Sequence, residues 1–173
     1  RRFFTRDDSP LMAMPDTDEA VISDVDLFDN LLAWIQNKPS RSPFLEVRRC
    51  AVQACNRIAP EIVFIQDQRY RVQGKLAIMG TRMLWTVYDK QFNLYNGLMF
   101  CDLTRNGNAG GCQQFDQRQV IQLTLRQNEQ LHHIKTTQQY GYVFTREIIP
   151  TSYLERIYVV DYTTLTYREY LNE

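Results

Sequence analysis

The sequence lacks the features that mark a membrane span, a nucleic-acid binder or a familiar enzyme. It has no run of about 18 apolar residues, the length that crosses a bilayer. Its 20 Lys and Arg residues balance 20 Asp and Glu residues, whereas nucleic-acid binders usually carry a basic excess. It contains no G-x-S-x-G, H-E-x-x-H or P-loop motif. We therefore expect no enzyme activity, no cofactor, no metal and no nucleic-acid partner.

The composition is that of a folded domain. Hydrophobic residues make up 44% of the 173 positions, more than a disordered chain contains. One domain fits this length, and we place it at residues 24–173, after a tail at residues 1–23 that shows no sustained periodicity. The chain opens on Arg-Arg-Phe-Phe, and such residues flank membrane spans at the interface. One interpretation is a removed or absent anchor before Arg1; the alternative is a trimmed boundary or a released polyprotein fragment.

Two helices are predicted before any strand. The first has a cap at Ser23 and Asp24, an apolar face of Leu27, Phe28, Leu31, Leu32 and Ile35, and an end at Pro39. The second has a cap at Ser42, Pro43 in its first turn, an apolar face of Phe44, Val47, Ala51, Ala54 and Ile58, and an end at Pro60. The short link between them predicts an antiparallel helical hairpin. The acidic pair Asp24 and Asp26 is interpreted as solvated and helix-capping.

From residue 61 onward the pattern changes to short runs rich in Val, Ile, Thr, Tyr and Phe, which are typical of strands. The predicted strands are 61–66, 69–73, 76–79, 83–88, 94–103, 120–126, 132–137, 140–148 and 157–160. Residues 167–171 are compatible with a last helical turn. Helices followed by a block of strands predict an α+β fold, in which the N-terminal helical hairpin packs on a mainly antiparallel β-sheet.

The four cysteines fall in two close pairs, Cys50 with Cys55 and Cys101 with Cys112, and are candidate disulfides of an oxidising compartment. On a helix the first two would be separated by about 7.5 Å, beyond the reach of a disulfide, so each is expected to bond elsewhere. The second pair brackets a Gly-rich turn and bonds across it or to the helix. Buried free thiols, and then a zinc site with the adjacent His132 and His133, are the alternatives.

The C-terminal third is rich in tyrosine and arginine, the residues that favour protein interfaces. Core packing explains most of the ten tyrosines, but this end of the chain is also the best candidate for a protein-contact surface. The candidate contact residues are Tyr140, Tyr142, Tyr153, Arg156, Tyr158, Tyr162, Tyr167 and Arg168.

Several segments resemble one known family: RRFFTRDDSPL, LLAWIQNKPSR with PFLEVRRC, GLMFCDL and QQYGYVFTREI. Together they are similar in texture, without a diagnostic motif, to the small baculovirus per os infectivity factors of the fourth type, envelope proteins of occlusion-derived virions. That resemblance implies an N-terminal anchor, which this chain does not show, and an exterior-facing ectodomain. It also implies a multi-protein envelope complex required for oral infection of insect midgut cells, and no enzyme activity.

The expected function is therefore a non-enzymatic, disulfide-stabilised ectodomain that acts through contacts with the other subunits of a viral envelope entry complex. The alternative is an intracellular adaptor of phage or viral head–tail or capsid assembly, with reduced thiols. A third hypothesis is a hydrolase that uses His132 or His133 beside a nucleophile and a carboxylate.

Overall fold

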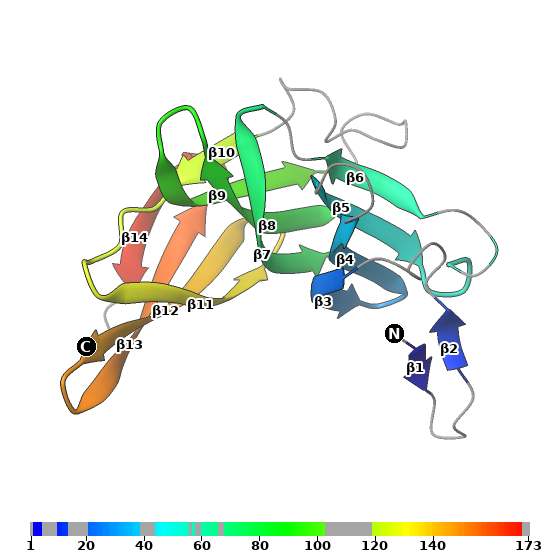
Figure 1. Ribbon diagram of the computed structural model, residues 1–173, viewed down its shortest axis with the longest axis horizontal. Helices are drawn as coiled ribbons and strands as arrows, with labels where there is room; N and C mark the ends of the chain where they lie inside the picture. The colour runs from blue at the N-terminus through cyan, green and yellow to red at the C-terminus, as the bar shows by residue number, and fades with distance from the viewer. Residues whose placement is uncertain are drawn as a thin grey trace.

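Strands in three four-stranded antiparallel sheets and one two-stranded sheet build this protein (Figure 1). The computed structural model describes residues 2–4, 10–13, 21–38, 44–55, 57, 60–65, 68–102 and 119–170. The N-terminal sheet has the order β3 (Val21–Phe28), β4 (Leu31–Lys38), β5 (Phe44–Ala51), β6 (Glu61–Ile65). The central sheet has the order β10 (Gln119–Gln122), β9 (Leu94–Asp102), β8 (Arg82–Asp89), β7 (Tyr70–Met79). The C-terminal sheet has the order β11 (Glu129–Thr136), β12 (Tyr140–Ile149), β13 (Ser152–Asp161), β14 (Thr166–Tyr170).

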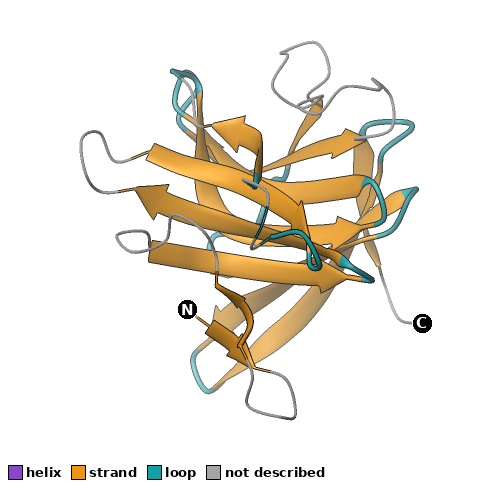
Figure 2. Cartoon of the chain, turned by 90° about the vertical axis from the view of Figure 1, so that its right-hand side faces the viewer, coloured by secondary structure: helices purple, strands orange, loops and turns teal. Residues whose placement is uncertain are grey.

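The central sheet is the middle layer of the protein, between the other two sheets (Figure 1; Figure 2). On one face, Met83, Trp85 and Val87 of β8 pack with residues of the N-terminal sheet in the first core cluster. On the other face, Leu84 of β8 packs with residues of the C-terminal sheet in the second. Because a strand alternates its side chains between two faces, burial of both faces requires an almost unbroken apolar run. This is why β8 reads Met-Leu-Trp-Thr-Val.

The predicted α+β fold with an N-terminal helical hairpin is wrong, because the described residues contain no helix. The first predicted helix is the β3–β4 hairpin, whose turn at residues 29–30 holds Asp29 at a φ of 53°. Apolar residues on both sides of this turn, Leu27 and Phe28 before it and Leu31 and Leu32 after it, imitate helical spacing. In β4, Ala33 and Ile35 face the central sheet, while Leu32 and Trp34 belong to a separate cluster. A strand buried on both faces therefore lacks the polar alternation by which strands are recognised.

The second predicted helix is β5 followed by a turn at residues 52–55. Its proposed start at Ser42 and Pro43 lies outside the described residues. Val47 faces the central sheet, and β5 pairs with β4 on one side and β6 on the other. The possible helical turn at residues 167–171 is also wrong over its described part, because β14 pairs with β13 as a strand.

The segment at residues 1–23 contains two short paired strands, β1 (Arg2–Phe4) and β2 (Pro10–Ala13). β3 begins at Val21, within the same segment.

Two aspartates of β3 close the free edge of the central sheet. Among the strands that the structure describes, β7 pairs only with β8, and its outward backbone N–H groups need acceptors. Asp24 Oδ2 accepts a hydrogen bond from Leu76 N at 2.8 Å, and Asp26 Oδ2 accepts one from Ile78 N at 2.9 Å. The donors are two residues apart, as are the acceptors, because both strands have a period of two. The interpretation of these acids as helix caps is therefore wrong: they cap a strand edge.

Replacing Asp24 by Leu should lower the free energy of unfolding by about 1–3 kcal/mol, because the buried edge N–H of Leu76 loses its charged acceptor. Asp24→Asn is the matched control, since its side-chain oxygen can still accept, and it should retain most of the stability. Urea unfolding followed by tryptophan fluorescence measures both variants. Equal losses in the two variants would contradict edge capping.

Candidate contact face and polar cleft

Aromatic and aliphatic side chains line the solvent side of the C-terminal sheet, which we call the outer face. In β12, Gly141, Val143 and Thr145 are buried, so Tyr140, Tyr142 and Phe144 point the other way. Register places Tyr142 opposite Val159 and Phe144 opposite Ile157, and Ile157 lies opposite Tyr170 of β14. These side chains are half-buried, except Tyr170, which is exposed. The outer face is therefore a continuous apolar strip over three strands.

Charged side chains border this strip. Lys135 lies opposite Tyr142 and Arg168 opposite Val159, while Arg146 and Glu155 form an ion pair at 3.2 Å. His133 packs its ring against Phe144, with centroids 5.8 Å apart. Partial loss of solvent first, and then the charge of Lys135, lower the pKa of His133 below its usual value. At neutral pH this histidine therefore adds no positive charge to the border.

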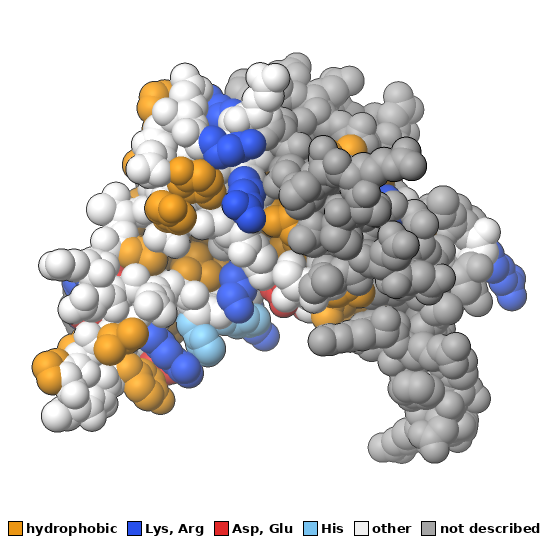
Figure 3. All heavy atoms as spheres, viewed as in Figure 1, with side chains coloured by type: hydrophobic (Ala, Val, Ile, Leu, Met, Phe, Trp, Pro, Cys, Tyr) orange, Lys and Arg blue, Asp and Glu red, His pale blue; other side chains and the backbone are white. Residues whose placement is uncertain are grey.

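The β12–β13 hairpin carries the outer face to an apolar tip that projects from the body of the protein (Figure 1). Ile148 is 54% exposed and Tyr153 is 55% exposed, and the two lie opposite each other in the register. The guanidinium of Arg146 lies 4.8 Å from the centre of the Tyr153 ring. Figure 3 shows hydrophobic, basic and histidine side chains together at this end of the molecule. Exposed apolar residues at a projecting tip are typical of a contact site.

The structure divides the predicted contact residues between two sides of one sheet. Tyr140, Tyr142, Tyr153 and Arg168 lie on the outer face. Tyr158, Tyr162, Arg156 and Tyr167 lie on the inner side, which faces the central sheet. Tyr158 and Tyr162 are buried and therefore cannot contact a partner. Our set of candidate contact residues omits Phe144 and Ile148, which also lie on the outer face. The period-two pattern of residues 140–148 could have identified them, because it assigns alternate residues of β12 to opposite faces.

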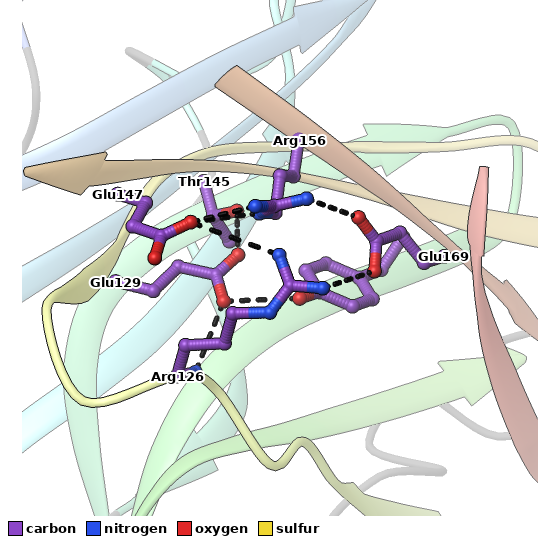
Figure 4. A network of polar contacts seen from close by, with 7 residues as sticks. Arg126, Glu129, Thr145, Glu147, Arg156 and Glu169 are labelled. Carbon is purple, nitrogen blue, oxygen red and sulfur yellow. Dashed lines mark hydrogen bonds and ion pairs between the residues drawn. The ribbon is translucent and has the colours of Figure 1, made fainter. Parts of the chain in front are cut away.

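Where the inner core of the C-terminal sheet ends, two arginines and two glutamates form a closed ring of ion pairs (Figure 4). Arg156 contacts Glu147 and Glu169, each at 2.6 Å. Arg126 contacts Glu169 at 3.0 Å and Glu147 at 3.7 Å. Each charge has two opposite neighbours, so the ring neutralises itself. Arg156 is therefore a structural residue here, committed to its two carboxylates.

Glu129 is buried beside this ring and is held by three donors. Thr145 donates its hydroxyl to Oε1, and Oε2 accepts hydrogen bonds from Tyr158 OH and the backbone N–H of Arg126, both at 3.0 Å. Burial, followed by the hydrogen bond to Glu129, raises the pKa of Tyr158 well above its usual value. Tyr158 therefore stays protonated and donating at physiological pH. The carboxylate of Glu129 is fixed in position by these contacts.

Tyr162 closes the contact between the central and C-terminal sheets. Its hydroxyl lies 2.6 Å from Thr136 Oγ1, and its ring lies 4.3 Å from that of Phe100, centre to centre. A Cβ at Gly141 would be 2.8 Å from the Tyr162 hydroxyl and 3.1 Å from Leu84. A larger residue at this position would have to displace the Tyr162 hydroxyl from Thr136. Burial raises the pKa of Tyr162 to about 12.

A polar chain is also buried in the N-terminal sheet. Trp34 Nε1 donates to Gln36 at 2.8 Å, Gln36 donates to Glu46 at 3.1 Å, and Arg48 donates to the same Glu46 oxygen at 2.7 Å. All four side chains are buried. Sequence reasoning missed this chain because Gln36 and Glu46 were assigned to helices. Its donors and acceptors satisfy one another, which stabilises a buried polar cluster.

A cleft of about 390 Å³ lies between the central sheet and β11. Most of the residues that line it have polar side chains, although their stems give it apolar surface too: Gln73, Lys75, Thr86, Tyr95, Asn96, Glu129, Gln130 and Leu131. Sequence reasoning missed it, because these residues come from four strands and no motif connects them. A mixed polar lining of this kind suits a ligand rich in hydrogen-bonding groups.

Cys50 and Cys55 form a disulfide, with Cα atoms 5.3 Å apart. The expectation that each bonds elsewhere is wrong, because it rested on a helix: β5 ends at Ala51, and the following turn returns Cys55 to Cys50. Cys55 is buried in a cluster with Leu32 and Trp34. Cys101 is also disulfide-bonded, while Cys112 and the Gly-rich turn lie outside the described residues.

No three His, Cys, Asp or Glu side chains gather as metal ligands within the described residues. His132 and His133 are both exposed. The same part of the chain contains no helix of the length and hydropathy that a membrane crossing requires.

The stability of the protein should fall between pH 10 and pH 12 because of Tyr162. Its pKa is about 10 in the unfolded chain and about 12 in the fold, so its stabilising contribution is complete below pH 10 and is lost as the pH rises through this window. Tyr162→Phe should reduce the slope of unfolding free energy against pH there, by up to about 1.4 kcal/mol per pH unit. Denaturant titrations from pH 8 to 12 measure this slope, with pH 8–9 as the internal control. An unchanged slope in the variant would disprove the assignment.

Compared with protein families, curated proteins and solved structures, the chain matches none. The outer face and the cleft are therefore interpreted from their own residues.

Proposed function

We propose that this chain is a non-enzymatic, exterior-facing subunit of a viral envelope entry complex, and that it docks to other subunits through the outer face. The observation that carries the proposal is the apolar strip over β12, β13 and β14 with its charged border. Protein interfaces commonly combine an apolar centre with a polar rim, and tyrosine and arginine are enriched at the positions that dominate their affinity.

The projecting tip extends this surface. Ile149 and Leu154 add exposed apolar area beside Ile148 and Tyr153, and no charged residue lies between positions 148 and 154. The polar groups on the inner side of the same sheet are already paired with one another. A partner that covers the outer face and the tip therefore removes apolar area from water. It leaves the ion pairs on the inner side of the sheet intact, so no charge is buried without its partner.

The cysteines support an exterior location. A disulfide across a five-residue separation, together with a second disulfide at Cys101, fits an oxidising compartment better than the cytosol. The resemblance to the per os infectivity factors suggests the biological setting: an occlusion-derived virion and oral infection of midgut cells.

The double variant Ile148→Ser/Tyr153→Ser should release the chain from its envelope complex. Loss of two exposed apolar anchors should weaken docking by about tenfold or more, while stability changes by less than about 0.5 kcal/mol. Native electrophoresis of detergent-extracted occlusion-derived virion envelopes, probed for the tagged chain, measures complex formation.

Phe92→Ser is the matched control, because Phe92 is 57% exposed and lies in the turn between β8 and β9, away from the outer face. It should migrate with the complex like the unchanged protein. A double variant that stays in the complex, or an unchanged chain that migrates alone, would refute docking through this surface.

Protein isolated from virions should resist alkylation at Cys50 and Cys55 until it is reduced, because the two sulfurs are bonded to each other. Mass spectrometry of peptides alkylated with and without a reductant measures this. Full alkylation of all cysteines without a reductant would overturn the exterior location and favour the intracellular assembly adaptor.

A further inference from the structure

At the cleft, β7 departs from regular pairing. Between Val72 and Leu76 the register with β8 shifts, and Gly74 takes a φ of 111°. The backbone N–H of Lys75 then donates to the Thr86 side chain at 3.0 Å instead of to a carbonyl of β8. Bulges of this kind redirect side chains and are frequent beside functional sites. Here the bulge brings Gln73, Lys75 and Thr86 to the cleft.

The β8–β9 hairpin turn, whose own residues do not line the cleft, is braced beside it. Asp89 accepts hydrogen bonds from the N–H groups of Gln91 and Phe92, and Tyr88 OH donates to Asn93 at 2.5 Å. Asn96 N donates to Gln73 Oε1 at 3.2 Å, and Gln122 donates its amide to the carbonyl of Tyr95. Gln73, Tyr95 and Asn96 of the cleft are therefore held in place before any ligand arrives, which lowers the entropy cost of binding.

Several groups at the cleft remain available once these contacts are counted. The side-chain amides of Asn96 and Gln130 make no hydrogen bond within the part of the chain that the structure describes, and Gln73 uses only its oxygen. Each primary amide both donates and accepts, and so matches the hydroxyl groups of a sugar, which also do both. The exposed ring of Tyr95 offers an apolar face for the C–H side of a sugar ring.

The charges of the cleft select for an acidic ligand. Glu129 lines the cleft, but its carboxylate is engaged by Thr145, Tyr158 and the Arg126 backbone. The ammonium group of Lys75 forms no ion pair with any described residue. The half-buried Lys75 therefore leaves one positive charge for a ligand to neutralise.

We infer that this cleft binds a carboxylated sugar residue of a glycan, with the carboxylate on Lys75, hydroxyls on Gln73, Asn96 and Gln130, and a ring face on Tyr95. The volume of about 390 Å³ lies in the range of roughly 300–1,000 Å³ that small-ligand sites occupy. Gln73, Lys75, Tyr95 and Asn96 lie on the central sheet, and Gln130 alone of the five pairs with a residue that borders the outer face, Arg146. The test at Lys75 is therefore independent of the docking proposal.

The test uses two acidic probes and one neutral probe: 3′-sialyllactose, a hyaluronan tetrasaccharide and lactose. Lactose lacks only the acidic sugar of the first probe. Isothermal titration calorimetry on the whole chain should detect binding of at least one acidic probe and little of lactose. In ¹⁵N spectra, the side-chain amide signals of Gln73, Asn96 and Gln130 should shift on addition of that probe.

Lys75→Gln should weaken the acidic probe by about tenfold or more, because a charge-assisted contact is lost. Lys90→Gln, an exposed lysine in the β8–β9 turn, is the matched control and should bind as the unchanged protein does. If Lys75→Gln does not fold, Gln130→Ala at an exposed position replaces it and should weaken binding by a smaller factor.

Three outcomes would overturn the inference: neither acidic probe binds at millimolar concentration, lactose binds as well as sialyllactose, or the shifted amides lie outside the cleft. Lys75→Gln should not change migration of the envelope complex, which keeps failure of this site distinguishable from failure of docking.

Discussion

Burial of the central sheet on both faces is the constraint on which the rest of this structure depends. Leu98 and Phe100 of β9 face the C-terminal sheet, while Met99 and Cys101 face the N-terminal sheet. Removal of either the N-terminal or the C-terminal sheet would expose one apolar face of the central sheet to water. The edge of such a sheet must also be closed, and the aspartates of β3 do this by accepting hydrogen bonds from β7.

The same constraint decides where polar groups lie. On the inner side of the C-terminal sheet, the apolar core around Val143 gives way to Thr145 and then to Glu147 along a single strand. At that point the charges must satisfy one another, and the ring of Arg126, Glu147, Arg156 and Glu169 does so. Because these charges are paired with one another, the recognition sites that we propose, the outer face and the cleft, lie elsewhere.

Part of this could be predicted from the sequence. The strands predicted at residues 76–79 and 140–148 lie within β7 and β12, since alternation and turn residues frame them. The helices were wrong because residues 32–35 are buried on both faces of the sheet, which removes the alternation, and because the turn at Asp29 was not recognised. Two-sided burial makes a strand look like part of a buried helix, and only length and turn chemistry distinguish the two.

The two candidate sites differ in how far a sequence can reveal them, and the reason is the range of their contacts. Tyr140, Tyr142 and Phe144 share a face because they are two residues apart on one strand, which is local information. Tyr158 was predicted at a contact surface but is buried. Ile157, Tyr158, Val159 and Val160 put apolar side chains on both faces of β13, so the pattern does not say which face packs on the core. The cleft combines residues beside a bulge at Gly74 with residues more than 50 positions away in the sequence: Lys75 and Gln130 both line it. Only the assembled sheets bring such residues together, and so a site that recognises a ligand can be present without any motif.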